Sequence, residues 1–427
     1  MMELNSLVAA VANPHCFPTN LKQKRPILFQ QRRPAGRASA RKILRQNKEK
    51  GSFAGDDFSI NHSQVIEKLS QRRTPVLAQE IFLELKPEEF PLNNSTLSSL
   101  MVRYIDGGLL LQAEAIWEEM LNSCFVPSVL VISKLLNTYG KMRRFDDIIK
   151  VLDQVKIRYL HLLPEAYSLA ISCFGKHGQL ELMENTLREM VSSGVPVDSR
   201  TGNSFIVYYS IFGSLMEMET AYGRLKRSRF LIEKEGILAM AFAYIRERKF
   251  YRLGEFLRDV GLRRKNVGNL LWNLLLLSYA ANFKMKSLQR EFLAMVEAGF
   301  NPDITTFNIR AVAFSRMDLL WDLHLSLEHM KHMKIEPDLV SYGCVVDAYV
   351  DRRLGRNLEF VLSKMNPDQP PISLTDPFVF EALGKGDFHM SSEAFMQFQK
   401  QKKWTYRELI SLYLKKQHRR DQVFWNY

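Results

Sequence analysis

Cysteine is scarce in this 427-residue chain, and its spacing argues against two kinds of small domain. The four cysteines lie far apart, and no two of them form a Cys-x-x-Cys pair. They are Cys16, Cys124, Cys173 and Cys344. Neither a zinc ribbon nor a disulfide framework is therefore indicated, and a reducing compartment is the default.

Long apolar runs are also missing. The longest candidate, Leu270 to Ala281, is interrupted by Asn273 and Ser278. It falls short of the roughly 18 residues that a membrane span needs. A buried helix fits this stretch better than a membrane span does.

Acidic residues are nearly absent from the first 50 residues, which contain 11 Lys and Arg but only Glu3 and Glu49. This leader carries +9 of the net charge of +13, which leaves +4 for residues 51–427. An acid-poor leader without a long apolar core is typical of an organellar transit peptide rather than a secretory signal. Because its first 20 residues contain no Lys or Arg, a chloroplast is favoured over a mitochondrion. A disordered basic tail that binds nucleic acid non-specifically is the alternative.

Catalytic motifs are the last absence. No P-loop, His-Glu-x-x-His or Gly-x-Ser-x-Gly pattern occurs. The one histidine cluster, His324, His329 and His332, has no further ligand or cysteine beside it, so we expect surface histidines rather than a metal site. The sequence predicts no enzyme, no metal and no cofactor.

What the chain does contain is a period of 35 residues. The stretch from Ile304 to Asp338 opens after one Pro-Asp and closes on another, and the stretch before it has the same length and ending. Extending this frame gives nine units without an insertion. They start at Ser59, Asn94, Val129, Pro164, Ser199, Lys234, Asn269, Ile304 and Leu339. Such a period indicates a repeat architecture.

Each unit predicts a pair of helices. Places 20, 24 and 27 are apolar in all nine units, and this spacing lies on one face of a helix. A shorter helix precedes it, and a glycine or a charged residue near place 15 separates the two. One helical hairpin cannot cover its own apolar faces, but stacked hairpins cover one another. We therefore predict an all-α solenoid over residues 59–366; a non-repetitive helical domain is the alternative.

The period is lost after three prolines between 367 and 371. Residues 374–427 still look helical, and Thr405 with Glu408 predicts a capping box ahead of a helix through about Arg419. A solenoid needs a terminal element that hides its last apolar face. We therefore expect residues 374–427 to form a helical cap.

The units resemble pentatricopeptide repeats of the repeats-only, plant organellar class. The resemblance rests on units such as SYGCVVDAYVDRRLGRNLEFVLSKM and on the Met-x-x-x-Gly-x-x-Pro-Asp ending of Met295 to Asp303. Tetratricopeptide repeats fit less well, because they want a small residue where this chain has Met120 and Met190. The resemblance covers residues 59 to about 366. It implies a right-handed α-solenoid superhelix that binds single-stranded RNA in its concave groove, about one base per repeat.

In this family the fifth and the last residue of a unit read the base. The resemblance implies one guanine-type Ser–Asp pair, two uracil-type Asn–Asp pairs, and one amide whose acidic partner departs from the pattern. In chain order these are Ser168 with Asp198, Asn273 with Asp303, Asn308 with Asp338, and Asn203 with Glu233. An amide offers both a donor and an acceptor to a base edge. For Asp303 and Asp338 the alternative is a turn acid that favours the N-terminus of the next helix.

Two further places of each unit are implied to contact RNA. The second place packs on bases, and the thirteenth is often basic and lies near phosphates. The matching residues are Leu130, Leu270 and Val340 at the second place, and Lys141, Lys176, Arg246 and Arg316 at the thirteenth. Contacts to phosphate would make the affinity salt-dependent, although each cation could equally be solvated at a helix end.

The predicted function is therefore binding of single-stranded organellar RNA in support of transcript processing, splicing or stabilisation. Other RNA-processing proteins are further candidate partners. A protein-binding helical scaffold with little RNA affinity is the alternative, because several units have lost the base-reading pattern and the repeat array is nearly neutral.

Overall fold

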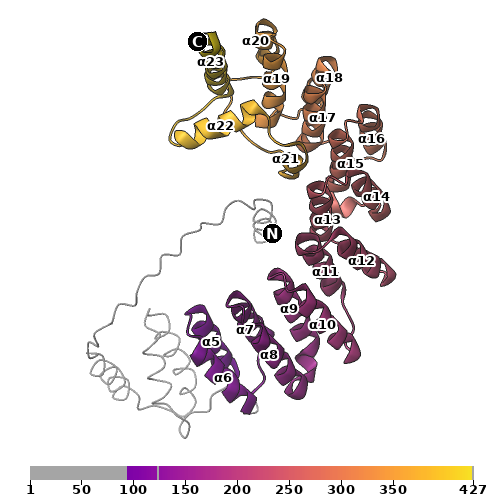
Figure 1. Cartoon of the computed structure of the whole chain (residues 1–427), viewed down its shortest axis with the longest axis vertical. Coiled ribbons are helices and arrows are strands. Elements are labelled where there is room, and N and C mark those ends of the chain that lie inside the picture. The colour runs from indigo at the N-terminus through magenta and orange to yellow at the C-terminus, as the bar shows by residue number, and fades with distance from the viewer. Residues whose placement is uncertain (1–93, 123–124, 426–427) are drawn as a thin grey trace, which may run out of the picture. The chain divides into compact units, whose positions relative to one another are not determined.

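The computed structural model describes residues 94–122 and 125–425, and over these residues the chain is helical, with no strand (Figure 1). The leader, residues 1–50, and the first predicted unit, 59–93, lie outside the described residues. The chain divides into two compact units, Met1–Thr201 and Gly202–Tyr427. Each unit is described by itself below.

The described part of the first unit consists of three helix pairs and the start of a fourth. The pairs are α5 (Asn94–Asp106) with α6 (Leu110–Asn122), α7 (Val129–Lys141) with α8 (Phe145–Arg158), and α9 (Leu163–Lys176) with α10 (Leu180–Ser192). A single 3₁₀ turn, η1 (Leu160–Leu162), precedes α9. The first helices α5, α7 and α9 pack on one another in order.

The second unit continues the same pattern and ends in three helices outside it. The pairs are α11 (Ser199–Phe212) with α12 (Leu215–Arg227), α13 (Lys234–Arg246) with α14 (Phe250–Val260), α15 (Leu270–Ala281) with α16 (Met285–Glu297), α17 (Ile304–Arg316) with α18 (Leu320–His332), and α19 (Leu339–Asp351) with α20 (Gly355–Ser363). A 3₁₀ turn, η2 (Lys265–Val267), precedes α15. The last helices are α21 (Phe378–Leu383), α22 (Asp387–Phe398) and α23 (Tyr406–Trp425).

The backbone repeats with the period read from the sequence. The second helices begin at Leu110, Phe145, Leu180, Leu215, Phe250, Met285, Leu320 and Gly355, each 35 residues after the last. Place 15 has a positive φ in seven of the eight described units, as at Gly108 (77°) and Arg143 (58°). This left-handed residue ends the first helix and turns the chain into the second. The described residues are thus an α-solenoid of helical repeats.

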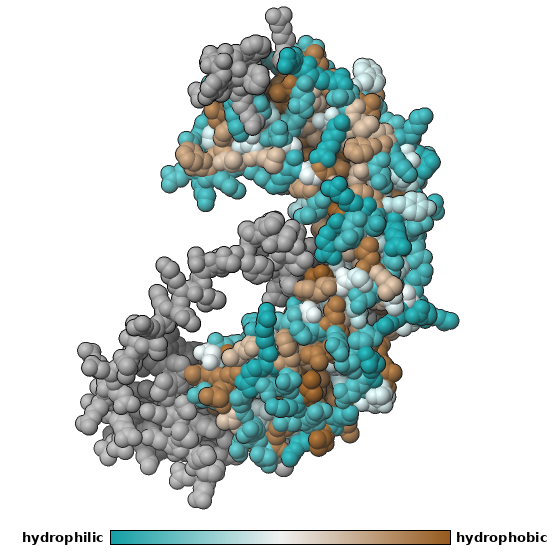
Figure 2. All heavy atoms as spheres, viewed as in Figure 1, coloured by the Kyte–Doolittle hydropathy of each residue, from teal (hydrophilic) through white to brown (hydrophobic). Residues whose placement is uncertain are grey.

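The apolar stripe of the second helices forms the core between pairs. All eight described residues at place 20 are at most 1% exposed, from Ala113 to Leu358. Each such large side chain stabilises the fold by roughly 1.5–3 kcal/mol. Figure 2 shows that hydrophilic residues cover much of the visible face and that hydrophobic ones appear between them. The core of each unit is therefore the set of seams between successive helices.

The C-terminal helices cover the last repeat. Helices α22 and α23 pack on α19, with Phe388 and Leu409 fully buried. The predicted capping box is present, because the Thr405 N–H donates to Glu408 Oε2 at 3.2 Å and the Glu408 N–H to Thr405 Oγ1 at 3.3 Å. The helix that it starts, α23, runs to Trp425, beyond the expected end near Arg419.

The carboxylate of Asp347 makes this cap sensitive to pH. Asp347 Oδ1 accepts the Phe388 N–H at 2.9 Å, at the start of α22. Burial is the main cause that raises the pKa of Asp347 from 3.8 to about 6; the charge of Asp387 contributes to this shift and the Phe388 N–H opposes it. Because the folded pKa lies above the unfolded one, the folded state holds this proton more tightly. The resulting stabilisation is present below about pH 4 and is lost as the pH rises through about 6.

We therefore expect Asp347→Asn to raise the free energy of unfolding, relative to wild type, by more at pH 7 than at pH 4. The amide keeps the acceptor for Phe388 but carries no charge to desolvate. The difference between variant and wild type should grow by up to about 3 kcal/mol from pH 4 to pH 7. Urea unfolding at both pH values measures it. Asp153→Asn, on the exposed side of α8, is the control, and an equal change in both variants would contradict the assignment.

Candidate nucleic-acid interface

The predicted pairs at the fifth and last places come together at the N-terminus of the following first helix. In the unit 269–303, Asp303 is the N-cap of α17, and its Oδ1 accepts the Thr306 N–H at 2.8 Å. The amide of Asn273 donates to the same carboxylate at 3.2 Å. Thr306 Oγ1 donates to Asn273 Oδ1 at 2.6 Å and so closes a three-residue network.

The next unit repeats this network. Asp338 caps α19 and accepts N–H groups of Val340 at 3.0 Å and of Ser341 at 3.2 Å. Asn308 Nδ2 donates to Asp338 Oδ1 at 2.8 Å, and Ser341 Oγ donates to Asn308 Oδ1 at 2.7 Å. In both repeats the aspartate carboxylate therefore caps the next helix, which was the alternative to base reading. The same carboxylate also orients the asparagine amide.

A segment of the cap covers the second network. Asp338 Oδ2 accepts the N–H groups of Leu374 and Thr375, each at 3.0 Å, and the Thr375 hydroxyl at 2.8 Å. The second N–H of Asn308 donates to Thr375 Oγ1 at 2.7 Å. Both N–H bonds of the Asn308 amide are thus in use, and Asn308 and Asp338 are 0% exposed. In this structure no base can reach the pair.

The other two pairs differ from these. In the unit 164–198, Ser168 Oγ lies 2.8 Å from Thr201 Oγ1, and the Thr201 N–H donates to the exposed Asp198 at 2.8 Å. The same three places are therefore linked, with Ser168 half-exposed. Asn203 is buried, and its amide binds backbone, accepting the Glu233 N–H and donating to the Leu231 carbonyl.

The hydroxyls at the third place of the following unit were missed from the sequence. Thr201, Thr306 and Ser341 each follow the capping aspartate by three residues. An Asp-x-x-Ser or Asp-x-x-Thr pattern ahead of an apolar run is a variant of the capping box and could have identified them.

The predicted stacking and phosphate residues also fall into two groups. In the first compact unit, Met1–Thr201, Leu130 is 59% exposed. In the same compact unit, Lys141 is exposed and Lys176 is half-exposed. In the second unit Leu270 and Val340 are buried, at 7% and 3% exposed. Arg246 and Arg316 are exposed there, and Arg246 Nη2 donates to the Ser210 carbonyl at 3.3 Å.

The histidine prediction is partly wrong. His324 is half-buried, with Nε2 lying 2.6 Å from the Tyr349 hydroxyl. His329 packs edge-on against Phe292 and Phe307. Burial lowers the pKa of both imidazoles. Both are therefore partly packed against neighbouring helices, His324 against α19 of the next repeat and His329 against α16 and α17.

Other sites give little chemistry. Burial raises the pKa of the free thiol of Cys173 to about 11, so it stays protonated near neutral pH. Among residues 94–122 and 125–425, no group of three or more His, Cys, Asp or Glu is arranged to hold a metal. In the same part of the chain, no helix has both the length and the apolar character to cross a bilayer.

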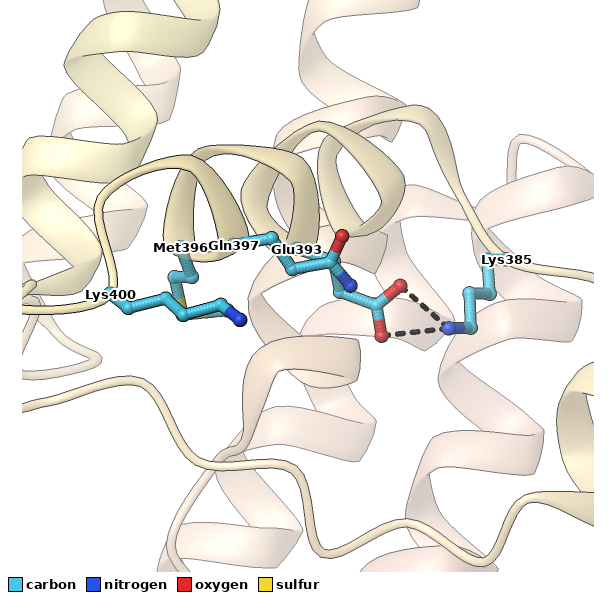
Figure 3. A pocket seen from close by; sticks show the side chains of 5 residues that line it. All are labelled: Lys385, Glu393, Met396, Gln397 and Lys400. Carbon is cyan, nitrogen blue, oxygen red and sulfur yellow. Dashed lines mark hydrogen bonds and ion pairs between the residues drawn. The ribbon is translucent and has the colours of Figure 1, made fainter. Parts of the chain in front are cut away.

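A shallow pocket of about 420 Å³ lies beside α22 (Figure 3). Its lining is Lys385, Glu393, Met396, Gln397 and Lys400. Lys385 Nζ binds both carboxylate oxygens of Glu393, at 2.6 and 2.7 Å. Because an exposed ion pair and flexible side chains make up the lining, we assign it no ligand.

Comparison with known proteins identifies the repeat. A family model described as PPR repeat matches residues 165–195, which lie in the α9–α10 pair. The α9–α10 pair is a pentatricopeptide repeat. The helix pairs of this chain before and after the match keep the same 35-residue spacing.

Pentatricopeptide repeat proteins are similar to this chain over longer stretches. The chain is 30% identical over 184 residues to a chloroplastic pentatricopeptide repeat-containing protein of Arabidopsis thaliana, which covers 42% of this chain and 37% of that protein. A putative mitochondrial member from the same plant is 22% identical over 306 residues, 71% of this chain and 49% of that protein. The chain thus spans less than half the length of these relatives.

A solved pentatricopeptide repeat structure is also similar. It is the crystal structure of PPR10, a maize protein, in complex with an 18-nt psaJ RNA element. The TM-score is 0.42 at 17% identity, over 78% of this chain and 49% of that chain.

Proposed function

We propose that this pentatricopeptide repeat protein binds single-stranded RNA through the first helices of the repeats in its first compact unit, Met1–Thr201. The observation that carries the proposal is on α7. Leu130 and Lys141 are 11 residues apart, or three helical turns, so they lie on the same face. One offers an exposed apolar surface to a base and the other an ammonium to a phosphate.

Helix α9 supplies polar groups. Lys176 lies near its C-terminal end, and Ser168 lies eight residues before it, about a quarter of a turn around the helix. The place that Leu130 takes in α7 is held in α9 by the exposed Glu165. Among the described residues, no carboxylate pairs with Lys141 or Lys176 at 4.0 Å or less. Ser168 with Asp198 is the proposed base-reading pair of this unit. The family resemblance also implies Asn273 with Asp303 and Asn308 with Asp338, but both asparagines are at most 4% exposed in this structure.

Transcript processing, splicing or stabilisation in an organelle is the proposed setting. The acid-poor leader and the chloroplastic and mitochondrial names of the relatives support this setting. The leader favours a chloroplast. Occupying a short single-stranded segment could act in each of these processes, with other RNA-processing proteins as partners.

A protein-binding scaffold is the second candidate. The observation that favours it is the peptide contact at Asp338, where a segment of the chain itself, rather than a nucleotide, fills the fifth and last places of a unit.

Titration of the full chain with labelled random and U-rich single-stranded RNA, at two salt concentrations, tests the first candidate. We expect saturable binding that weakens with salt. The double variant Lys141→Glu/Lys176→Glu should bind about tenfold or more weakly. Its salt dependence should also be shallower by about 1.4 in log K against log salt, because two phosphate contacts are lost.

The control places the same charge change on second helices. Lys286 in α16 and Lys331 in α18 are exposed, and Lys286→Glu/Lys331→Glu should bind RNA nearly as wild type does. Equal losses in both double variants would indicate only bulk charge. Binding that neither saturates nor responds to salt would exclude the RNA function and leave the scaffold.

A further inference from the structure

One segment of the cap lies along the first helices of the second unit. This segment, residues 372–383, is here named the strap. It consists of an extended stretch followed by α21, and α21 packs on α13, α15 and α17 (Figure 1). It therefore lies over the helices whose second and fifth places are expected to face RNA.

Hydrogen bonds hold the extended stretch of the strap at both of its ends. The Leu339 N–H donates to the Ile372 carbonyl at 2.8 Å, and the Asp376 N–H donates to Thr305 Oγ1 at 3.0 Å. Thr375 lies between these contacts and binds Asn308 and Asp338 through its hydroxyl and its N–H. A threonine thus makes the donor and acceptor contacts that a base edge would otherwise make there.

Burial shows how complete this cover is. Of the six second and fifth places in the last three repeats, five are at most 7% exposed and the sixth, Gly343, is also buried, whereas Leu130 in α7 is 59% exposed. The buried residues are Leu270, Asn273, Thr305, Asn308 and Val340. The strap itself buries Phe378, Val379 and Leu383.

The strap is also fixed from outside the groove. Tyr406 Oη accepts the Ile372 N–H at 3.0 Å, and the Arg407 N–H donates to the Pro367 carbonyl at 2.9 Å. After the strap, α22 packs on α19. Releasing residues 372–376 would therefore require the cap on either side to move. Replacing the buried side chains of Phe378, Val379 and Leu383 by one stacked base would also be unfavourable, because it would expose apolar surface to water.

The negative charge of the strap also disfavours RNA in this place. The strap carries Asp376 and Glu381 and no Lys or Arg, and both carboxylates are exposed. RNA entering beside them would bring its phosphates close to like charges, and in place of a basic track it would meet an acidic peptide.

We propose that the strap is a permanent occupant of this groove and that Thr375 takes the place of a base at Asn308 and Asp338. RNA reading is then confined to repeats before α13, the first helix that the strap contacts. This inference deepens the proposed function and rests on it for its specificity arm, but the occupancy itself can be tested without RNA.

Hydrogen exchange on the full chain tests occupancy. In the free protein, peptides that contain Leu374 and Thr375 should exchange as slowly as those of α19, because both N–H groups donate to a buried carboxylate. Adding saturating single-stranded RNA should leave this protection unchanged. Exchange at the rate of a solvent-exposed loop, or faster exchange when RNA is added, would overturn the proposal, the latter by showing that RNA displaces the strap.

Substitutions at the fifth place of a repeat test which repeats determine the base preference of RNA binding. Asn308→Ser should leave the base preference of RNA binding as in wild type, within about twofold at every nucleotide. Ser168→Asn is the matched change at an accessible fifth place and should shift the preference at one nucleotide from guanine towards uracil. A one-nucleotide shift with Asn308→Ser would overturn the proposal.

RNA binding and permanent occupancy by the strap are tested by different outcomes. If no RNA binds, the proposed function fails, but slow exchange of the strap in the free protein still supports a groove filled by peptide. If RNA binds and the strap exchanges rapidly, the function stands and permanent occupancy fails. Circular dichroism of Asn308→Ser and Ser168→Asn confirms that both variants fold.

Discussion

Asp338→Ala is expected to lower the free energy of unfolding of the second unit by roughly 3–5 kcal/mol. The carboxylate is fully buried and serves three elements at once: it caps α19, holds Asn308 and binds the strap. Loss of a helix cap alone costs about 1 kcal/mol. Each buried donor left without its acceptor adds about 1–3 kcal/mol, so the sum is large.

Urea unfolding of the full chain measures this effect. Four of the five tryptophans lie beyond residue 202, so tryptophan fluorescence reports mainly on the second unit. A repeat array need not unfold in one step, and the shift of this transition's midpoint is therefore the quantity to compare. The strap should also lose protection from hydrogen exchange in Asp338→Ala.

The matched control is Asp303→Ala. Asp303 caps α17 in the same way, but it is half-exposed and receives no strap N–H among the contacts of the described residues. Its replacement should cost only about 1–2 kcal/mol. Equal losses at the two positions would mean that capping alone explains Asp338.

Tyr406→Ala is expected to cost about 3–5 kcal/mol in the same assay. The ring is 0% exposed and stacks on Tyr342 with centroids 3.8 Å apart. It lies at the start of α23 and also fixes the strap through Ile372. Its removal would leave a cavity between the cap and the last repeat and would free one end of the strap.

Tyr406→Phe separates packing from hydrogen bonding. It keeps the stacked ring and loses the hydroxyl, which accepts the Ile372 N–H at 3.0 Å and donates to the Ile372 carbonyl at 3.3 Å, so it should cost about 1–2 kcal/mol. If Tyr406→Ala lowered stability no more than Tyr406→Phe, the cap would not be docked on α19 as the structure shows.

The repeats could be predicted because their signals are local. The apolar residues at places 20, 24 and 27 lie within one helix, and the helix starts follow the predicted frame to within one residue, as at Leu163 and Leu270. The pairing of Asn273 with Asp303 and of Asn308 with Asp338 came from the family resemblance, and the structure brings both pairs into contact. Local patterning did not show that His324 and His329 would be packed, because their partners lie on other helices: Tyr349 in the next repeat contacts His324, and Phe292 and Phe307 contact His329.

The strap could not be predicted, because nothing periodic marks it. Thr375 meets Asn308 across 67 residues, and Asp376 meets Thr305 across 71. The surrounding sequence has the prolines and polar residues of an ordinary linker. A fifth-place asparagine also reads the same in the sequence whether its partner is a base or a threonine.

These long spans matter while the chain is being made. Contacts between neighbouring repeats join residues about 30–37 positions apart, as in Asn308 with Asp338, so each helix pair can dock soon after the next emerges from the ribosome. Thr375 follows Asp338 by 37 residues, which take roughly 2–7 s to synthesise at 5–20 residues per second. During that interval the nascent protein exposes an Asn–Asp surface that the finished protein has closed.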